Sequence, residues 1–444
     1  MDREEELAQQ IENEVLQNLD FSREIPDVEV YALIEEAMQK VCCQQHLPLR
    51  DKLSLRTEVF HSMRGMDVLT PLLEDDTITE IMVNGYDSIF IERDGQLVKA
   101  PLRFRSVEKY HTIVQQIVAD SNRVVNESTP IVDARLSDGS RVNVVLSPIS
   151  LGGTAMTIRK FPKEALTMEK LITLHSLPAE VAGLLELLVK SGYNILISGG
   201  TGSGKTTFLN ALSEYIPSSQ RIITIEDSAE LQLHNISNLV RLEVRNANVE
   251  GKNAITIRDL IRSSLRMRPD RIIVGEVRGE EALDMLQALN TGHDGSISTG
   301  HANSARDMLS RLETMVLMGF SMPIPALRRQ IASALELVIH LGRLRDHSRR
   351  VMEITEVLGV EQDEIVCQTW YEFVERREKE NVREENLNRE ENLNREEGNR
   401  KRGEVMGHLV QKNSLKQVMK LKEAGYYEEF CSRIEEMKGE EYGL

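Results

Sequence analysis

The sequence has few aromatic residues and few cysteines, and both shortages narrow what the protein can be. Aromatic residues make up 4% of the 444 residues, with a single tryptophan, so few side chains are available to stack on nucleic-acid bases. The four cysteines include the adjacent pair Cys42 and Cys43 and show no metal-ligand spacing. We therefore expect a reducing compartment and no structural zinc.

Long apolar runs are also missing. The most apolar stretch, residues 181–189, is interrupted by Glu186 and is much shorter than the roughly 18 residues that span a bilayer. The opening residues, MDREEELAQQ, are acidic and lack the apolar centre of a secretory signal. We expect a cytoplasmic protein whose membrane contact is made only through a partner.

Basic residues are outnumbered by acidic ones, 54 against 71, which gives a formal net charge of -17. A large non-specific nucleic-acid surface needs the opposite balance, so we expect no direct nucleic-acid partner, although a local basic groove remains compatible with this composition. The length exceeds what one hydrophobic core usually supports, which predicts two or three domains.

Changes in periodicity divide the chain into segments. Helical spacing comes first, then alternating strands with turns, then a regular alternation of strands and helices that ends in two short strands. A repeated six-residue unit, REENLN, follows and predicts a solvated charged linker; helical spacing then returns. The predicted segments are 1–65 (helical), 66–160 (a small α/β domain), 161–374 (a larger α/β domain), 375–403 (the linker) and 404–444 (a helical tail that docks back).

The stretch YNILISGGTGSGKTTFLNAL carries the strongest functional signal. A strand and a helix flank the pattern G-x-x-x-x-G-K-[ST], here named the phosphate loop (residues 199–206). Its glycines let backbone N–H groups point at phosphate oxygens, Lys205 adds a positive charge, and the Thr206 hydroxyl can ligate Mg²⁺. The predicted ligands are ATP and Mg²⁺, since no guanine-reading N-K-x-D motif is present. The expected nucleotide-binding residues are Gly199, Gly200, Thr201, Gly202, Ser203, Gly204, Lys205, Thr206 and Thr207.

A second buried strand, in PDRIIVGEVRG, ends in a single acid. Gly275 stands where a nucleotide hydrolase usually has the first acid of a pair, and only Glu276 remains. If this strand lies beside the strand that precedes the phosphate loop, Glu276 faces the phosphates, because ligands bind at the carboxyl edge of a parallel sheet. Glu276 and Thr206 are then the predicted Mg²⁺ residues. The alternative is a strand that happens to end in a solvated glutamate.

Two further clusters point to the same chemistry. Glu226, Asp227 and Glu230 follow another β-branched strand, and any of them could polarise a water molecule; alternatively they are acids in the first turn of a helix. His293 and His301 flank a short strand between glycines, where a histidine can sense a γ-phosphate or serve a structural role.

Arginines are the candidates for neutralising a transition state. Arg159 is the preferred phosphate clamp, and Arg141 is a second candidate. Arg258, Arg262 and Arg266 recur every four residues and are further candidates, with a solvated or subunit-facing surface as the alternative explanation of their stripe.

Together these motifs resemble the type II/type IV secretion ATPase superfamily, and especially its CpaF-like branch, which serves Flp or tight-adherence pili. The residues that carry the resemblance are GGTGSGKTT (Walker A), TIEDSAEL (the acidic box), LRMRPDRIIVGEVRGEEALDMLQALNTGHDGS (a glycine-containing Walker B and its continuation) and STGHANS (the histidine box). LLEDDTITEIMVNGYDSIFIERDG resembles the opening of the family's N-terminal domain.

The resemblance implies a RecA-like ATPase domain, a smaller α/β N-terminal domain that closes over the nucleotide, a homohexamer and an inner-membrane platform protein as partner. It places the protein at the cytoplasmic face of the cell membrane. The catalytic residues it implies are Glu276, Glu226, Asp227, Glu230, His301 and Arg159, with Arg141 as a further nucleotide-binding residue. Glycine before the Walker B acid is usual in this superfamily, whereas Ser228 replaces a frequent proline and the repeat-bearing C-terminal tail has no recognised counterpart.

The function predicted is an ATP-hydrolysing motor for pilus assembly or protein secretion. A nucleic-acid translocase, such as a conjugation motor, and a nucleotide-gated scaffold that does not hydrolyse ATP are the alternatives.

Overall fold

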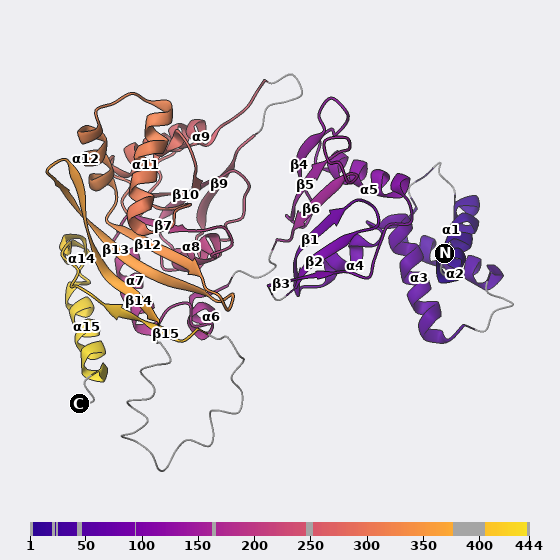
Figure 1. Ribbon diagram of the computed structural model, residues 1–444, viewed down its shortest axis with the longest axis horizontal. Helices are drawn as coiled ribbons and strands as arrows, with labels where there is room; N and C mark the ends of the chain where they lie inside the picture. The colour runs from indigo at the N-terminus through magenta and orange to yellow at the C-terminus, as the bar shows by residue number, and fades with distance from the viewer. Residues whose placement is uncertain are drawn as a thin grey trace, which may run out of the picture. The chain divides into compact units, whose positions relative to one another are not determined.

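The chain forms two compact units, residues 1–163 and 164–444, each with hydrophobic cores of its own (Figure 1). The computed structural model describes residues 3–19, 23, 25–41, 47–93, 95–161, 166–245, 252–375 and 405–441. The charged repeat predicted at 375–403 lies outside these residues apart from Glu375. No helix among the described residues is both long enough and apolar enough to cross a membrane.

The first unit begins with three helices, α1 (Arg3–Asn18), α2 (Asp27–Val41) and α3 (Leu49–Arg64), as the spacing of apolar residues predicted. They share one core, which contains Ile11, Ile34 and Val59. A short helix, α4 (Leu69–Glu74), leads into the sheet.

A six-stranded antiparallel sheet completes the first unit, in the order β3-β2-β1-β6-β5-β4. Its strands are β1 (Ile78–Asn84), β2 (Ile89–Arg93), β3 (Gln96–Lys99), β4 (Ile131–Arg135), β5 (Arg141–Val145) and β6 (Ala155–Arg159). Alternate residues of the strands pack with helix α5 (Val107–Asp120) in a single core, which leaves the polar alternates on the other face.

The second unit is built on a nine-stranded sheet in the order β15-β14-β13-β12-β7-β11-β10-β8-β9. The strands from β12 to β9 run parallel, and β13, β14 and β15 extend the sheet antiparallel. The strands are β7 (Ile195–Gly199), β8 (Arg221–Glu226), β9 (Asn238–Glu243), β10 (Arg271–Val277), β11 (Ile297–Gly300), β12 (Leu337–Arg343), β13 (Arg349–Glu361), β14 (Glu364–Glu375) and β15 (Gly407–Gln411).

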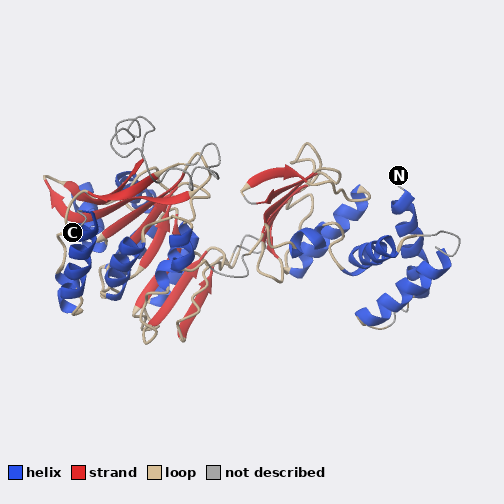
Figure 2. Cartoon of the chain, turned by 90° about the horizontal axis from the view of Figure 1, so that it is seen from below, coloured by secondary structure: helices blue, strands red, loops and turns tan. Residues whose placement is uncertain are grey.

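Helices cover both faces of this sheet, as Figure 2 shows. One core contains α6 (Met168–Thr173), α7 (Ala179–Lys190), α8 (Lys205–Ser213), α14 (Met419–Glu423) and α15 (Tyr427–Glu441). The other contains α9 (Ile257–Ser264), α10 (Glu281–Leu289), α11 (Ala305–Gly319) and α12 (Ile324–Ala334). The predicted α/β fold class is confirmed, with a smaller α/β unit first and the parallel sheet second.

Two details of the C-terminal region differ from the prediction. Residues 407–411 form strand β15 rather than part of a helical tail, because they pair with the edge of β14, from Glu375 opposite Gly407 to Tyr371 opposite Gln411. The apolar residues of this segment are compatible with either period, and the available sheet edge decides between them. The helical prediction is confirmed for α14 and α15. Strands β13 and β14, predicted to be short, have 13 and 12 residues.

Candidate functional site

The phosphate loop connects the buried strand β7 to helix α8, as its sequence pattern predicted. Gly202 and Gly204 adopt positive φ angles of 72° and 91°, which a residue with a side chain rarely adopts. At Gly199 a Cβ atom would lie 2.5 Å from the Leu341 carbonyl oxygen. The loop therefore requires glycine at these places. Thr206 and Thr207 follow in the first turn of α8 and remain partly exposed.

Lys205 lies across the phosphate loop. Its side chain is buried, and its Nζ donates to the carbonyl oxygens of Gly199 at 3.1 Å and Gly200 at 3.0 Å. A third contact runs to His301 Nδ1 at 3.2 Å. The ammonium group is thus held beside the loop, at the N-terminal end of α8, where an anion is favoured by the helix dipole.

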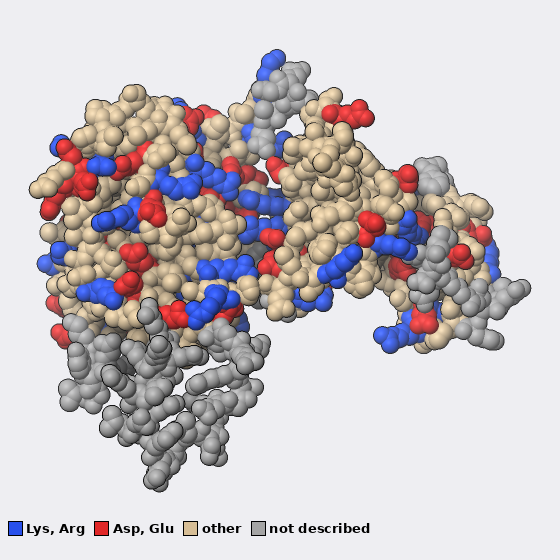
Figure 3. All heavy atoms as spheres, in the orientation of Figure 1, with Lys and Arg blue, Asp and Glu red and all other residues tan. Residues whose placement is uncertain are grey.

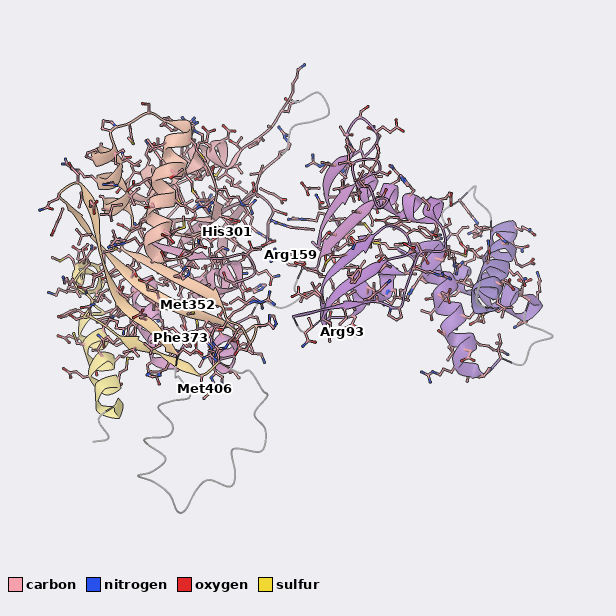
Figure 4. All side chains as sticks on the ribbon, viewed as in Figure 1. Arg93, Arg159, His301, Met352, Phe373 and Met406 are labelled. Atoms are coloured by element: carbon pink, nitrogen blue, oxygen red, sulfur yellow. The ribbon has the colours of Figure 1, made fainter. Side chains whose placement is uncertain are left out.

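The strand that carries Glu276 is not a neighbour of β7. Strand β11 lies between β7 and β10, so the condition on which Glu276 was expected to face the phosphates is not met directly. His301, which follows β11, spans the gap: its Nε2 lies 2.8 Å from Glu276 Oε1 while its Nδ1 contacts Lys205. Lys205, His301 and Glu276 are therefore brought together, with the histidine in the middle (His301 is labelled in Figure 4).

The surroundings of His301 favour the neutral form of its imidazole. Burial and the positive charge of Lys205 lower the pKa of its imidazole, with Arg278 and Arg311 adding to this effect, although Glu276 opposes it. Because an ammonium group can only donate, Nδ1 must accept from Lys205, and the ring proton then sits on Nε2 facing Glu276. The ring can therefore report a change at one partner to the other.

The two carboxylate oxygens of Glu276 have different surroundings. Oε2 accepts from Arg278 at 2.6 Å, and the same guanidinium reaches Asp227 at 3.4 Å. Oε1 is buried and forms no aligned hydrogen bond with the part of the chain that is described, despite the nearby His301 ring. A carboxylate oxygen has two lone pairs, so Oε1 can accept from a water molecule or a metal-bound water while the His301 ring stays close.

The side chain of Glu226 explains why residue 275 is a glycine. Strands β8 and β10 are parallel neighbours, with Ile225 opposite Val274. A Cβ atom at Gly275 would lie 2.9 Å from Glu226 Cγ, a distance that real Cβ atoms do not show. The space that the first Walker B acid would occupy is thus filled from the adjacent strand.

Glu226 is itself buried, with 3% of its surface exposed. Its Oε2 accepts from the backbone N–H groups of Glu230 at 2.7 Å and Leu231 at 2.9 Å, while Oε1 has no hydrogen-bond partner among the described residues. Burial is the main reason why the pKa of this carboxyl is raised. Residues 227–237 form bends and turns rather than a helix, so the alternative of a first helical turn is wrong for these acids.

The remaining candidates in the second unit have local partners. His293 Nδ1 lies 3.0 Å from the Ala288 carbonyl oxygen, which supports its structural interpretation. Arg258 and Arg262 both donate to Asp284, each at 2.8 Å, and so join α9 to α10. The predicted stripe is therefore largely an intramolecular clamp. Arg266 lies beyond the end of α9.

Arg141 and Arg159 belong to a row of arginines in the first unit. Across the polar face of its sheet, Arg135 lies opposite Arg141, and Arg141 lies opposite Arg159. Glu80 continues the row beyond Arg159 and lies 3.8 Å from it. Like charges directly opposite one another are unfavourable unless anions are close. The phosphate loop belongs to the other unit, so the approach of these arginines to a nucleotide stays a prediction.

The sequence did not predict the residues that line a cavity beside the phosphate loop. The cavity holds about 250 Å³ and is lined by apolar residues of α6 and α8 and by the start of β13. His347 and Arg349, which precede and open β13, contribute to the lining. His340 of β12 was also missed, although its Nδ1 lies 2.9 Å from Ser198 Oγ. These residues lie far from the phosphate loop in the sequence and belong to no short motif. Only the fold therefore shows that they are close to the site.

Comparisons with known proteins identify several relatives of this chain. The chain is 35% identical over 311 residues to a putative conjugal transfer protein of Mycobacterium tuberculosis, covering 67% of this chain and 88% of the relative. It is 33% identical over 316 residues to the type IV secretion system protein PtlH of Bordetella pertussis, covering 65% and 93%. Among solved structures, the VirB11 ATPase of the Brucella suis type IV secretion system matches 64% of this chain and 91% of its own, with 30% identity and a TM-score of 0.35.

The family model described as Type II/IV secretion system protein matches residues 63–434, which leaves only α1, α2 and most of α3 before it. This match spans both units and includes the phosphate loop, the acidic residues at the carboxyl ends of β8 and β10, and His301. The chain therefore belongs to the type II/IV secretion system protein family.

Proposed function

We propose that this protein is an ATP-hydrolysing motor that assembles as a homohexamer and drives pilus assembly or protein secretion through an inner-membrane platform protein. The observation that carries the proposal is the chain of contacts from Lys205 through His301 to Glu276. A phosphate-binding ammonium and an acid with an open oxygen are what direct attack of water on a γ-phosphate requires.

Each residue has a distinct part in this proposal. Backbone N–H groups of the phosphate loop and Lys205 bind the β- and γ-phosphates. Glu276 orients the attacking water, and His301 links that acid to the phosphate side. Glu226, Asp227 and Glu230 are further catalytic acids, any of which could polarise the attacking water, while Arg159 and Arg141 supply positive charge from the first unit.

Mg²⁺ fits the donor set. Thr206 offers a hydroxyl in the first turn of α8, Glu276 offers a buried carboxylate oxygen without an aligned partner, and Glu226 offers a second such oxygen. Hard oxygen donors, few in number and supplemented by water, are the usual surroundings of this ion. Mg²⁺ would be held by Thr206 and Glu276, and it would neutralise charge on the phosphates.

The cavity beside the loop supports nucleotide binding further. Apolar side chains, including Leu171 and Phe208, line it next to Thr207 and Gly204. A cavity of this composition suits the flat, largely apolar face of a purine base, and its position next to the phosphate loop suits a single nucleotide.

The test is hydrolysis of ATP by the full chain. Phosphate release that needs Mg²⁺ and is lost in Lys205→Ala supports the proposal. ATP binding without phosphate release above background would instead identify a nucleotide-gated scaffold.

The CpaF-like branch, with a role in Flp or tight-adherence pili at the cytoplasmic face of the membrane, is our proposal for the biological setting. It rests on the motifs TIEDSAEL and STGHANS in their sequence context. Prepilin, prepilin peptidase and platform-protein genes beside this one would support it.

A nucleic-acid translocase is the second candidate, because several relatives are described as conjugal transfer proteins. In the view of Figure 3, acidic and basic side chains are interspersed over the second unit. The overall charge of -17 weighs against a DNA track. Stimulation of ATP hydrolysis by DNA would favour the translocase, and an unchanged rate would favour the secretion motor.

A further inference from the structure

The turn between β12 and β13, residues 344–348, presents Arg349 to the phosphate loop. Arg349 Nε donates to the Gly202 carbonyl oxygen at 2.9 Å. A Cβ atom at Gly204 would lie 3.4 Å from Arg349 Cδ. The arginine therefore lies against two glycines of the loop, from a part of the sequence about 145 residues away.

The turn is tightly hydrogen-bonded. Asp346 Oδ1 accepts from the Ser348 backbone N–H at 3.0 Å and from its hydroxyl at 2.6 Å. The Leu344 N–H donates to the Ser348 carbonyl oxygen at 2.8 Å. Just beyond the turn, the Ser176 hydroxyl donates to the Arg349 carbonyl oxygen at 2.9 Å. The backbone around Arg349 is therefore fixed by hydrogen bonds of the preceding Ser348 and of its own carbonyl group.

The same turn holds the residue that leads into β15. The Val405 N–H donates to Asp346 Oδ2 at 2.8 Å, and Arg350 donates to the Val405 carbonyl oxygen at 3.0 Å. Val405 is fully buried. One carboxylate, that of Asp346, therefore shapes the turn with one oxygen and anchors the C-terminal strand with the other.

The end of β14 is fastened to the same place. Arg345 of the turn pairs with Glu375, the last residue of β14. The Arg350 guanidinium lies over the Phe373 ring, 5.4 Å from its centroid. Figure 4 labels Phe373 on β14 and Met406, the residue just before β15. Both strands that flank residues 376–404 thus reach the turn that supports the phosphate loop.

We propose that Arg349 is a positioning residue for the phosphate loop and that the β12–β13 turn couples nucleotide binding to the β14–β15 strand pair through Asp346 and Val405. The inference rests on the proposed function and specifies how that site is regulated. If Val405 moves away, Asp346 loses one of its hydrogen-bond donors, and the turn that positions Arg349 becomes less constrained. By linkage, a nucleotide that orders the loop must stabilise the Val405 anchor by the same factor.

Three variants of the full chain separate these contacts. Arg349→Gln removes the donor to Gly202, and we expect Mg²⁺-dependent affinity for a fluorescent ATP analogue to fall about tenfold, as for loss of a charged hydrogen bond. Asp346→Asn keeps the shape but has one acceptor oxygen for two tasks, and we expect a fall of about three- to tenfold. Lys412→Ala, which removes the pair that Lys412, just after β15, forms with Glu372 of β14, should bind like the wild type.

Hydrogen exchange distinguishes coupling from a purely structural role. In the wild type, the ATP analogue should slow exchange of the peptide that covers residues 405–411. In Asp346→Asn at saturating analogue, that slowing should disappear while the melting temperature without nucleotide changes by only a few degrees. A variant that merely weakened the fold would speed exchange equally with and without the analogue.

The outcomes also separate this inference from the proposed function. Wild-type affinity in both Arg349→Gln and Asp346→Asn, or an exchange rate at 405–411 that ignores the nucleotide, overturns the coupling. If the wild type itself binds no nucleotide and Lys205→Ala changes nothing, the proposed function fails instead.

Discussion

The imidazole of His301 joins Lys205 to Glu276, with Nδ1 3.2 Å from the lysine Nζ and Nε2 2.8 Å from the carboxylate Oε1. One ring therefore contacts the residue expected to bind phosphate and the acid expected to orient water. Since β11 separates β10, which carries Glu276, from β7, which leads into the phosphate loop, the histidine just after β11 is the direct connection between Lys205 and Glu276.

Removing either end of this connection should abolish turnover by different routes. Lys205→Ala should lose nucleotide binding, because the phosphate charge then lacks its buried ammonium partner. Glu276→Gln should keep binding but lower hydrolysis by about a hundredfold or more, since an amide is a poor base. Fluorescent nucleotide titration and phosphate release measure the two effects. Lys190→Ala, which breaks a half-buried pair with Glu186 on α7, is the matched control, and wild-type turnover in both site variants would refute the assignment.

The two histidines around β11 should differ in their importance. His301→Ala should lower hydrolysis by about tenfold to a hundredfold with a smaller change in nucleotide affinity, because Glu276 loses its link to the phosphate side. His293→Ala should hydrolyse ATP like the wild type, because its ring hydrogen-bonds to the neighbouring Ala288 carbonyl oxygen and Thr291 hydroxyl. Equal losses in both variants would mean that His301, too, is structural.

Substitution of Gly275 tests the packing of Glu226. Gly275→Ala places a methyl group 2.9 Å from Glu226 Cγ, so the buried carboxylate must move, at a cost of about 1–3 kcal/mol in the free energy of unfolding. Combining it with Glu226→Ala removes the clash, and the double variant should regain much of the stability lost in Gly275→Ala. Chemical denaturation of the four proteins gives the coupling energy. Additive losses would show that the two sites do not compete for space.

The sequence predicted the parts of the site that short motifs encode and missed those that the topology brings in. The glycines and Lys205 were identified because a phosphate loop needs them in a fixed order. The role of Gly275 was not, because its neighbour Glu226 comes from another strand about 50 residues earlier. Arg349 and His340 were missed for the same reason. The residues of β15 were predicted to be helical, because the sequence of one apolar segment does not show that a sheet edge is available for pairing.

His340 should make stability depend on pH. Burial lowers the pKa of this histidine and Lys205 adds to the effect, while Glu353 and Asp307 oppose it; Ser198 Oγ contacts its Nδ1. Below the ordinary histidine pKa of about 6.5, the unfolded chain therefore binds a proton that the folded chain resists. The free energy of unfolding should fall as the pH is lowered from about 7 through this range.

The variant His340→Gln isolates that contribution. Its free energy of unfolding should fall less than that of the wild type between about pH 7 and pH 5.5, because the glutamine does not titrate. Denaturant titrations at the two pH values provide the measurement. Parallel losses in the wild type and the variant would assign the acid sensitivity to other groups.

If the arginine row of the first unit binds phosphate, ATP hydrolysis needs residues of the first unit as well as those of the second. Arg159→Ala should lower ATP hydrolysis on the order of a hundredfold or more while leaving the unit folded, because an arginine that neutralises transferring phosphate contributes at least that much. Arg141→Ala should act in the same direction. Arg93→Ala, on β2 of the same sheet, removes an arginine paired with Asp75 at 2.6 Å, and it should retain wild-type hydrolysis (Arg93 and Arg159 are labelled in Figure 4). Phosphate release by the three variants, each with an unchanged circular dichroism spectrum, decides the matter: wild-type rates in Arg159→Ala and Arg141→Ala would leave the row with a structural role only.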